Sequence, residues 1–179
     1  LSQIVIALSK VTDAFLKPDG VGAFAIHALT VCNTEPSLSV AMNLCELHPS
    51  LMAQVHVNAS SLHGTPLFTG ESILHIAAVN KREDFLVKIV EMAHERLPRS
   101  DLEGLLRSQA EGFFFHKAPM LYYGGSALSY ACIFEMRHGI LALLSTGAVT
   151  LNSRAAGCKS SGFLALHAIV ANGMLSMYD

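Results

Sequence analysis

The stretch GESILHIAA, at positions 70–78, decides the fold of this chain. It places His75 between Leu74 and Ile76, a few residues after a glycine and a serine. Three roles are open to such a histidine: catalytic base, metal ligand or structural peg. The stretch has counterparts in the same chain that begin at Gly22 (GAFAIHALT), Gly124 (GGSALSYAC) and Gly162 (GFLALHAIV). Four copies of one pattern indicate an internal repeat.

The four copies share one register. An apolar residue follows each glycine by four positions, and the next residue is His27, His75, Ser129 or His167. Successive glycines, starting with Gly22 and Gly70, are 48, 54 and 38 residues apart, so a search for a fixed period would miss them. We interpret the glycine as the residue of a tight turn. We interpret the histidine as a structural peg that hydrogen-bonds backbone groups of the adjacent turn.

A second amphipathic stretch follows each of the first three copies. The apolar residues that recur on one helical face are Val40, Leu44 and Leu47 in the first, Phe85, Leu86, Ile89, Val90 and Ala93 in the second, and Ile140, Leu141, Leu143 and Leu144 in the third. This spacing predicts helices, and Gly147 is expected to end the third one. The charged residues within 81–88 and 96–103 are interpreted as solvated helix ends.

These patterns predict one all-α domain over residues 1–179, built as a solenoid of helix-turn-helix repeats with long finger loops. A partial repeat is expected over 1–20, and further repeats start near residues 21, 70, 124 and 162, the last one truncated. The long spacings are assigned to loops at 48–69, 94–123 and 145–161. Insertions in a solenoid gather on one face, which is often the binding face.

Composition narrows the classes of function. The chain has 179 residues, of which 51% are hydrophobic and 15% charged, and its formal net charge is −2. It can therefore bury a sizeable core, and it lacks the basic surface that binds nucleic acid. The longest nearly apolar run, over 21–32, is about half of the roughly 20 residues that a spanning helix needs. We expect no direct membrane insertion and no signal peptide, and we expect a fragment of a longer protein.

Enzymatic chemistry finds no support in the motifs. The four cysteines, Cys32, Cys45, Cys132 and Cys158, form no CxxC pair, which favours free buried thiols in a reducing compartment. Sequence patterns of metalloproteases, serine hydrolases and phosphate-binding loops are absent. His56 and His63 share a loop without an acidic or thiol partner at ligand spacing. We expect a protein that is no enzyme, with no catalytic residue, no metal site and no cofactor.

The repeat motif resembles the ankyrin signature, and three segments resemble one ankyrin-containing family in particular. YYGGSALSYAC, residues 122–132, is similar to the third repeat of vanilloid-type transient receptor potential channels. HVNASSLHGTPLFTGESILHIAAVNKRED, residues 56–84, resembles the first finger and second repeat of those channels. GFLALHAIVANGMLSMYD, residues 162–179, resembles their fourth repeat. The resemblance runs in order from about residue 19 to residue 179.

This resemblance implies the cytosolic ankyrin repeat domain of a calcium-permeable cation channel, on the cytoplasmic side of a membrane. Its role would be regulation and assembly through protein contacts. The implied partners are neighbouring subunits of a homotetramer and a cytosolic regulatory protein. A free-standing soluble ankyrin adaptor is the alternative, with the same fold and the same lack of catalysis.

The resemblance also marks positions on the binding face. Family members that bind ATP use two lysines of the first inner helix, and Ala23 and Ala28 stand at those positions here. Phe68 and Glu71 align with an aromatic residue and a glutamine that help to hold the nucleotide. We therefore expect no ATP binding in the manner of the family. Concave-face or finger contacts are expected from Phe68, Glu71, Phe114, Tyr122 and Tyr123. The aromatic cluster of the second finger has two readings, a binding surface or the internal packing of a long loop.

Overall fold

The structure, a computed structural model, is mostly helical, as an all-α fold requires. It describes residues 2–10, 12–57, 67, 69–110, 125–154 and 164–171. The elements in chain order are α1 (Ser2–Ser9), the 3-10 helix η1 (Asp13–Leu16), α2 (Ala25–Cys32), α3 (Glu35–Leu47), the 3-10 helix η2 (Pro49–Ala53), α4 (Ile73–Val79), α5 (Glu83–Arg96), α6 (Arg99–Arg107), β1 (Gln109–Ala110), β2 (Gly125–Ser126), α7 (Ala127–Ile133), α8 (Arg137–Ser145) and α9 (Ala165–Ala171).

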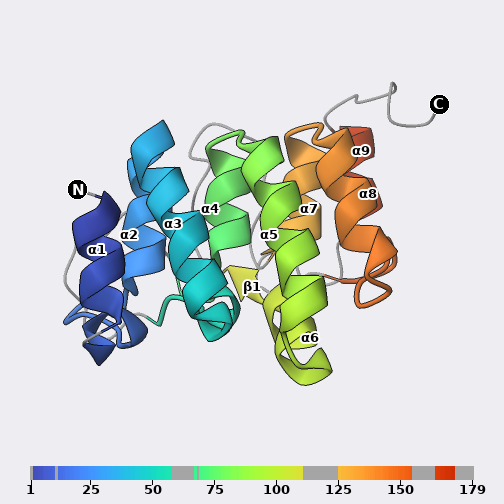
Figure 1. Ribbon diagram of the computed structural model, residues 1–179. Helices are drawn as coiled ribbons and strands as arrows, with labels where there is room; N and C mark the ends of the chain where they lie inside the picture. Colours follow the sequence, from blue (N-terminus) through green and yellow to red (C-terminus); the bar gives the residue numbers. More distant parts are fainter. Residues whose placement is uncertain are drawn as a thin grey trace.

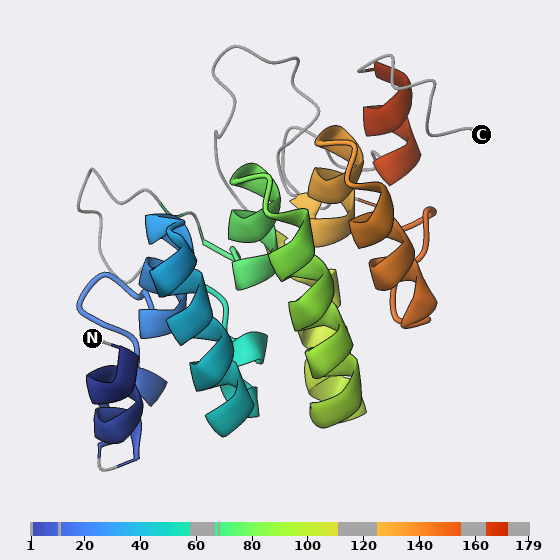
Figure 2. The same cartoon turned by 45° about the horizontal axis from the view of Figure 1, so that its top comes forward.

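The helices form two layers that run the length of the molecule (Figure 1). One layer, which we call the inner layer, contains α2, α4, α7 and α9, each packed against the next. The outer layer contains α1, α3, α5 and α8 in the same order. Short turns connect α2 to α3, α4 to α5 and α7 to α8, so each pair is a helical hairpin, and Figure 2 shows the hairpins side by side.

The hairpins keep one register relative to the motif glycines. Each inner helix begins three residues after its glycine, at Ala25, Ile73, Ala127 and Ala165. Each outer helix begins thirteen residues after the glycine, at Glu35, Glu83 and Arg137. The unequal spacing of the motifs therefore arises after the start of the outer helix, partly in the length of that helix (13, 14 and 9 residues) and mainly in the connection to the next hairpin.

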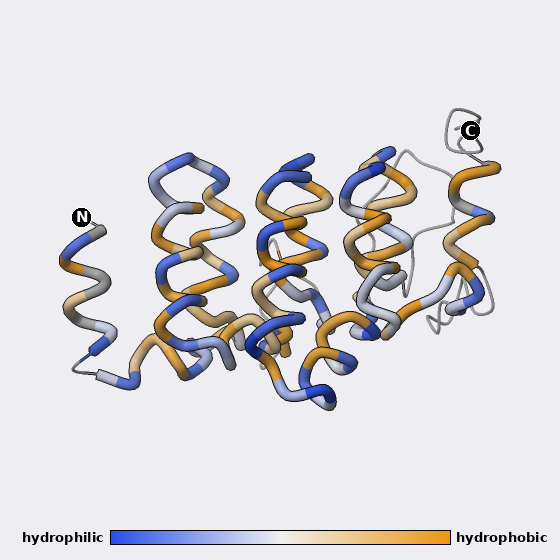
Figure 3. The backbone as a smooth tube through the Cα atoms, turned by 45° about the vertical axis from the view of Figure 1, so that its right-hand side comes forward, coloured by the Kyte–Doolittle hydropathy of each residue, from blue (hydrophilic) through white to orange (hydrophobic). Residues whose placement is uncertain are grey.

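The turn inside each hairpin contains one residue in the left-handed conformation. These residues are Asn33, Lys81 and Glu135, with φ values of 53°, 56° and 55°, and each follows its motif glycine by eleven positions. A non-glycine residue pays a steric cost of roughly 1–2 kcal/mol in this region. The turns are hydrophilic while the helices carry long apolar segments (Figure 3). The shared position of the left-handed residue shows that the hairpins repeat in backbone conformation as well as in sequence.

Short antiparallel pairings precede three inner helices. The Cα partners are Val55 with Ser72, Gln109 with Ser126, Ala110 with Gly125, and Arg154 with Leu164. One partner in each pairing lies two residues after a motif glycine, at Ser72, Ser126 and Leu164. The connections between hairpins therefore close at equivalent points, directly before the inner helices.

The core lies between the two layers. The apolar residues four positions after the first three glycines, Ile26, Leu74 and Leu128, are completely buried. All five residues of the predicted face of α5 are buried as well. Two predicted core positions are wrong, because Leu47 is 41% exposed and Leu141 is 60% exposed. Both lie on outer helices, Leu47 at the end of α3 and Leu141 within α8.

The connection over 94–123, expected to be a loop, contains the helix α6. Its buried residues are Leu102, Leu105 and Leu106, which recur at helical spacing. Arg99, expected to be solvated, donates a hydrogen bond to the carbonyl oxygen of Thr146, and Arg107 donates one to the carbonyl oxygen of Ala148, both after α8. The α6 helix is thus an extension of the second hairpin that holds the loop after the third.

Candidate functional site

His75 connects two neighbouring hairpins from a fully buried position at the start of α4. Its Nδ1 accepts a hydrogen bond from the Ser72 backbone N–H at 3.2 Å, and the Ser72 Oγ lies 2.9 Å from the same nitrogen. Its Nε2 lies 3.1 Å from the carbonyl oxygen of Gly125, in the strand before α7. The neutral ring with its proton on Nε2 satisfies this arrangement. The Tyr130 ring packs edge-on at a centroid distance of 5.1 Å.

His27 repeats this geometry in the first hairpin. Its Nδ1 accepts from the Phe24 backbone N–H, and its Nε2 donates to the carbonyl oxygen of Gln54, both at 3.2 Å. Gln54 precedes Val55 in the connection to the next hairpin. His27 and His75 therefore perform one function twice: each fixes its own helix start and binds the backbone that leads to the following hairpin.

Burial keeps both imidazoles neutral. Loss of solvation lowers the pKa of His27 to about 4 and the pKa of His75 to about 4. The hydrogen bonds that the two rings donate to the carbonyl oxygens of Gln54 and Gly125 raise the pKa, but they do not cancel the effect of burial. At neutral pH each ring is an acceptor on one nitrogen and a donor on the other, as a structural peg requires.

The other two copies of the motif differ in detail. Ser129 is buried, and its backbone N–H donates to the Ser126 Oγ at 3.5 Å, so a serine pair replaces the histidine. His167 accepts a hydrogen bond from the Leu164 N–H at 2.9 Å, in the same way as His27 and His75. Its side chain is exposed, whereas theirs are buried. The hydrogen bond between the histidine and the turn before the inner helix is thus retained at His167.

Two motif glycines occupy backbone conformations that disfavour other residues. Gly22 and Gly70 have φ values of 85° and 82°. A Cβ atom at Gly70 would also collide with the carbonyl oxygen of Gln109 in β1, the strand that follows α6 and pairs with β2. Gly70 therefore permits both a tight turn and the close approach of the strand that leads to the next hairpin. The remaining motif glycines, Gly124 and Gly162, lie outside the described residues.

The expected contact residues are only partly placed by the structure. Glu71 is completely buried, so the expectation of a surface contact at this side chain is corrected. It lies in the turn before α4, and its charge helps to raise the pKa of the buried Tyr130 phenol, after the larger effect of lost solvation. Phe68, Phe114, Tyr122 and Tyr123 lie outside the described residues.

The first inner helix borders a shallow hollow of about 280 Å³. Ala23 and Ala28, at the positions of the family's lysines, line it together with Lys17 and Asp19. The Asp19 Oδ1 accepts hydrogen bonds from the N–H groups of Val21 and Ala23, and the bond from Ala23 is the main cause that lowers the pKa of this carboxyl. Lys17 is the single cationic side chain among the residues that line this hollow.

Of the described cysteines, Cys45 and Cys132 are core residues, whereas Cys32 is exposed, so the expectation of a buried thiol at Cys32 is wrong. Cys45 and Cys132 are completely buried, and lost solvation raises the pKa of each thiol to about 12. A thiol in this state is a poor nucleophile and a poor metal ligand at neutral pH. Within the described ranges, no three His, Cys, Asp or Glu side chains converge on a point that could hold a metal ion.

Polar contacts also join the turns of successive hairpins. Arg82 donates from Nε to the Asn33 Oδ1 at 2.7 Å and forms an ion pair of 2.7 Å with Glu35. The Glu83 carboxylate accepts a hydrogen bond of 3.0 Å from the Gly139 N–H, near the start of α8. The sequence reading assigned Arg82 and Glu83 to a solvated helix end. The left-handed turn at Asn33 presents hydrogen-bond acceptors to the next hairpin, which the local sequence pattern does not indicate.

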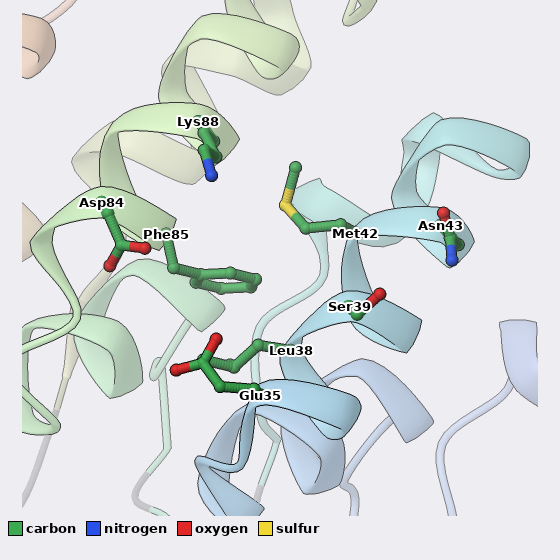
Figure 4. A pocket seen from close by; sticks show the side chains of 8 residues that line it. All are labelled: Glu35, Leu38, Ser39, Met42, Asn43, Asp84, Phe85 and Lys88. Atoms are coloured by element: carbon green, nitrogen blue, oxygen red, sulfur yellow. The ribbon is translucent and has the colours of Figure 1, made fainter. Parts of the chain in front are cut away.

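An open groove separates two outer helices, α3 and α5, and has a volume of about 330 Å³ (Figure 4). Its floor contains Leu38, Met42 and Phe85, and the carboxylates of Glu35 and Asp84, in the first turns of α3 and α5, border it from the two opposite helices. The sequence pattern of either helix alone does not indicate this groove, because the groove depends on how the residues of α3 and α5 face each other.

A second hollow, of about 360 Å³, lies between α8 and α9 and is more apolar. Leu141, Leu151 and Leu166 line it and are 60%, 38% and 38% exposed. By comparison with the three complete hairpins, it lies where an outer helix paired with α9 would pack.

Comparison with known proteins adds no identification. Neither a protein-family model nor a curated protein matches this chain. Over the part of the chain that the structure describes, no helix has the length and apolar character needed to cross a membrane.

Proposed function

We propose that this chain is an ankyrin repeat solenoid that works as a protein-interaction module. The observation that carries the proposal is the common register of the hairpins, in which inner helix, turn and outer helix begin at fixed offsets from the motif glycine. The histidine pegs at His27 and His75 support it, because they connect each hairpin to the next in the same way. Repeat stacks of this kind present extended surfaces and contact partners without chemistry.

We further propose that the module is the cytosolic regulatory and assembly domain of a channel of the vanilloid transient receptor potential type. The support is the resemblance of residues 122–132, 56–84 and 162–179 to the fingers and repeats of that family. Its partners would be neighbouring subunits of a homotetramer and a cytosolic regulatory protein. The alternative, a soluble ankyrin adaptor, shares the helix stack but has no pore.

The proposed mechanism is mechanical coupling along the stack. Each hairpin contacts only its neighbours, so stability and strain pass through nearest-neighbour interfaces. His75 and the Arg82–Asn33 bond cross such interfaces in buried or half-buried positions. A partner that binds one hairpin would thereby shift the conformation of the next and, in a channel, bias the gate.

The full-length coding sequence tests the channel proposal. Amplifying and sequencing the transcript on both sides of this segment should reveal six apolar segments, each of about 20 residues, after the codon for Asp179. Expression of that protein in cultured cells should then increase calcium entry. A complete open reading frame without such segments would reject the channel and favour the adaptor.

A further inference from the structure

The outer helices are not evenly packed. The α5 helix packs extensively against α8 but makes few contacts with α3. The cause lies at one repeat position, fifteen residues after the motif glycine, which is Gly139 on α8 and Phe85 on α5. At Gly139 an added Cβ would lie 3.1 Å from the Leu86 Cδ2, so glycine permits the close contact of α8 with α5. Phe85 places a large ring at the equivalent position facing α3.

The Phe85 ring acts as a wedge that opens the groove. The ring is 3% exposed, so it is anchored in the core, and it forms the floor of the groove together with Leu38 and the half-buried Met42. Figure 4 shows the ring between the two helices, with Met42 on one side and the acidic residues on the other. A rigid aromatic ring beside a flexible methionine is a surface that accepts an apolar side chain.

The charged residues that border the groove indicate the charge of the ligand that it would bind. Asp84 and Glu35 both border the groove, and both are exposed. Glu35 pairs with Arg82, but Asp84 makes no ion pair with any described residue. Lys88 borders the groove one helical turn from Asp84, so a cation is attracted to the acidic side of the groove and not to its whole length.

We propose that the groove between α3 and α5 binds an amphipathic segment of a partner protein. An apolar side chain of that segment lies on Met42 and Phe85, and an arginine or lysine faces Asp84 and Glu35. The inference rests on the proposed role as an interaction module, to which it adds a surface and the chemistry of the partner. Binding between two outer helices leaves the inner helices accessible to other contacts.

The test uses the 179-residue chain with 13C-labelled methionine methyl groups, with the Met42 signal assigned from a Met42→Leu variant. Three capped peptides serve as probes: acetyl-Leu-Arg-Ala-Leu-Arg-Ala-amide and the versions with glutamate or glutamine in place of arginine. The arginine peptide should shift the Met42 signal saturably, and the other two should bind more weakly. Added salt should weaken the arginine peptide most, because its contribution is electrostatic.

Variants locate the binding. Asp84→Asn should weaken the arginine peptide about two- to fivefold, which is the range for one exposed ion pair. Asp101→Asn is the matched control, since Asp101 is also an exposed aspartate in the first turn of a helix, and it should leave binding unchanged. Ser39→Arg places a cation in the groove from an exposed position and should abolish the shift. Circular dichroism of each variant checks that the fold is retained.

Several outcomes would overturn the proposal. These are an unchanged Met42 signal with the arginine peptide, equal binding of the glutamate peptide, or equal losses from Asp84→Asn and Asp101→Asn. A Met42 shift that depends on protein concentration without peptide would assign the groove to a second copy of the chain instead. Peptide binding is independent of the downstream coding sequence, so failure of the groove and failure of the channel proposal are separate results.

Discussion

His75 lies where three parts of the chain meet: the turn before α4, the helix itself and the strand before α7. Its two ring nitrogens are used in opposite senses, as acceptor from Ser72 and donor to Gly125. This arrangement answers the question that the motif posed. A general base or metal ligand needs a free nitrogen with access to solvent or substrate, and His75 is completely buried with both nitrogens bonded.

Replacing His75 tests its structural role. We expect His75→Ala to lower the free energy of unfolding by roughly 1–3 kcal/mol, because it leaves buried backbone groups at Ser72 and Gly125 without their partner. Urea denaturation followed by circular dichroism measures the change. His94→Ala on the exposed side of α5 is the control and should change stability by less than about 0.5 kcal/mol. Equal effects of the two substitutions would contradict the role of His75.

The lowered pKa of His75 predicts a pH dependence with a definite sign. In the unfolded chain the pKa of this histidine is near its ordinary value of 6.5, whereas burial in the folded protein lowers the pKa to about 4. The unfolded state therefore binds more protons between these values, and stability falls as the pH falls through this window. The destabilisation caused by His75→Ala should be smaller at pH 5 than at pH 7.5 by about 2 kcal/mol. A pH-independent difference between the two proteins, from urea denaturation at both pH values, would refute the account.

At the scale of elements, the outer helices differ in how closely they can approach. A Cβ atom at Gly139 would lie 3.1 Å from the Leu86 Cδ2 of α5, which is closer than ordinary van der Waals contact. We expect Gly139→Leu to destabilise the domain by about 1–3 kcal/mol, as overpacking does. Gly104→Leu is the matched control, since nothing lies within 4 Å of a Cβ at Gly104 on α6, and a better helix former there should stabilise slightly. Thermal unfolding of both variants gives the comparison, and equal changes would show that α8 and α5 do not pack as described.

The sequence predicted the helical hairpins well because their signals are local. Each inner helix is marked by a glycine, by a polar or apolar residue that precedes the helix, and by an apolar residue four positions after the glycine. These offsets are the same in all four copies. The helix α6 was missed although Leu102, Leu105 and Leu106 show helical spacing, because the segment was read as part of a finger. The left-handed turn residues had a signal too: Gly173 stands at the same offset in the fourth copy as Asn33, Lys81 and Glu135.

The candidate site was less predictable, because it depends on pairs of helices. The burial of Glu71 follows from how the turn before α4 packs against α7, which no single stretch encodes. The groove at α3 and α5 results from the difference between Phe85 and Gly139, and this difference has meaning only after the repeats are aligned. Side chains that bridge hairpins, such as Arg82, were assigned to solvent for the same reason.

At the scale of the whole molecule, the first inner helix predicts what the stack does not bind. Ala23 and Ala28 supply no counter-charge for a triphosphate, and such charge is what phosphate recognition requires. We expect no concentration-dependent rise in melting temperature with ATP at millimolar levels. A ligand present at a hundred times its Kd would stabilise by about 2.7 kcal/mol, so binding at the micromolar level would be detected. A saturable rise would overturn this expectation, and Lys17→Ala would then test whether Lys17 supplies the charge.

The two layers of helices form one continuous stack from α1 to α9 (Figure 1). Its neighbour contacts are made by buried histidines, by arginines that bind carbonyl oxygens, and by apolar side chains between the layers. Such a structure can transmit the binding of a partner along its length. This property fits a regulatory domain of a channel, and it also fits an adaptor that joins two proteins.

The mass of the full-length protein tests the central claim most directly. The protein would be expressed from its complete coding sequence, extracted in detergent, and measured by mass photometry with the detergent contribution subtracted. The account predicts particles that contain four copies, and it predicts that the protein stays in the membrane fraction until detergent is added. A monomer that purifies from the aqueous fraction without detergent would contradict the channel assignment.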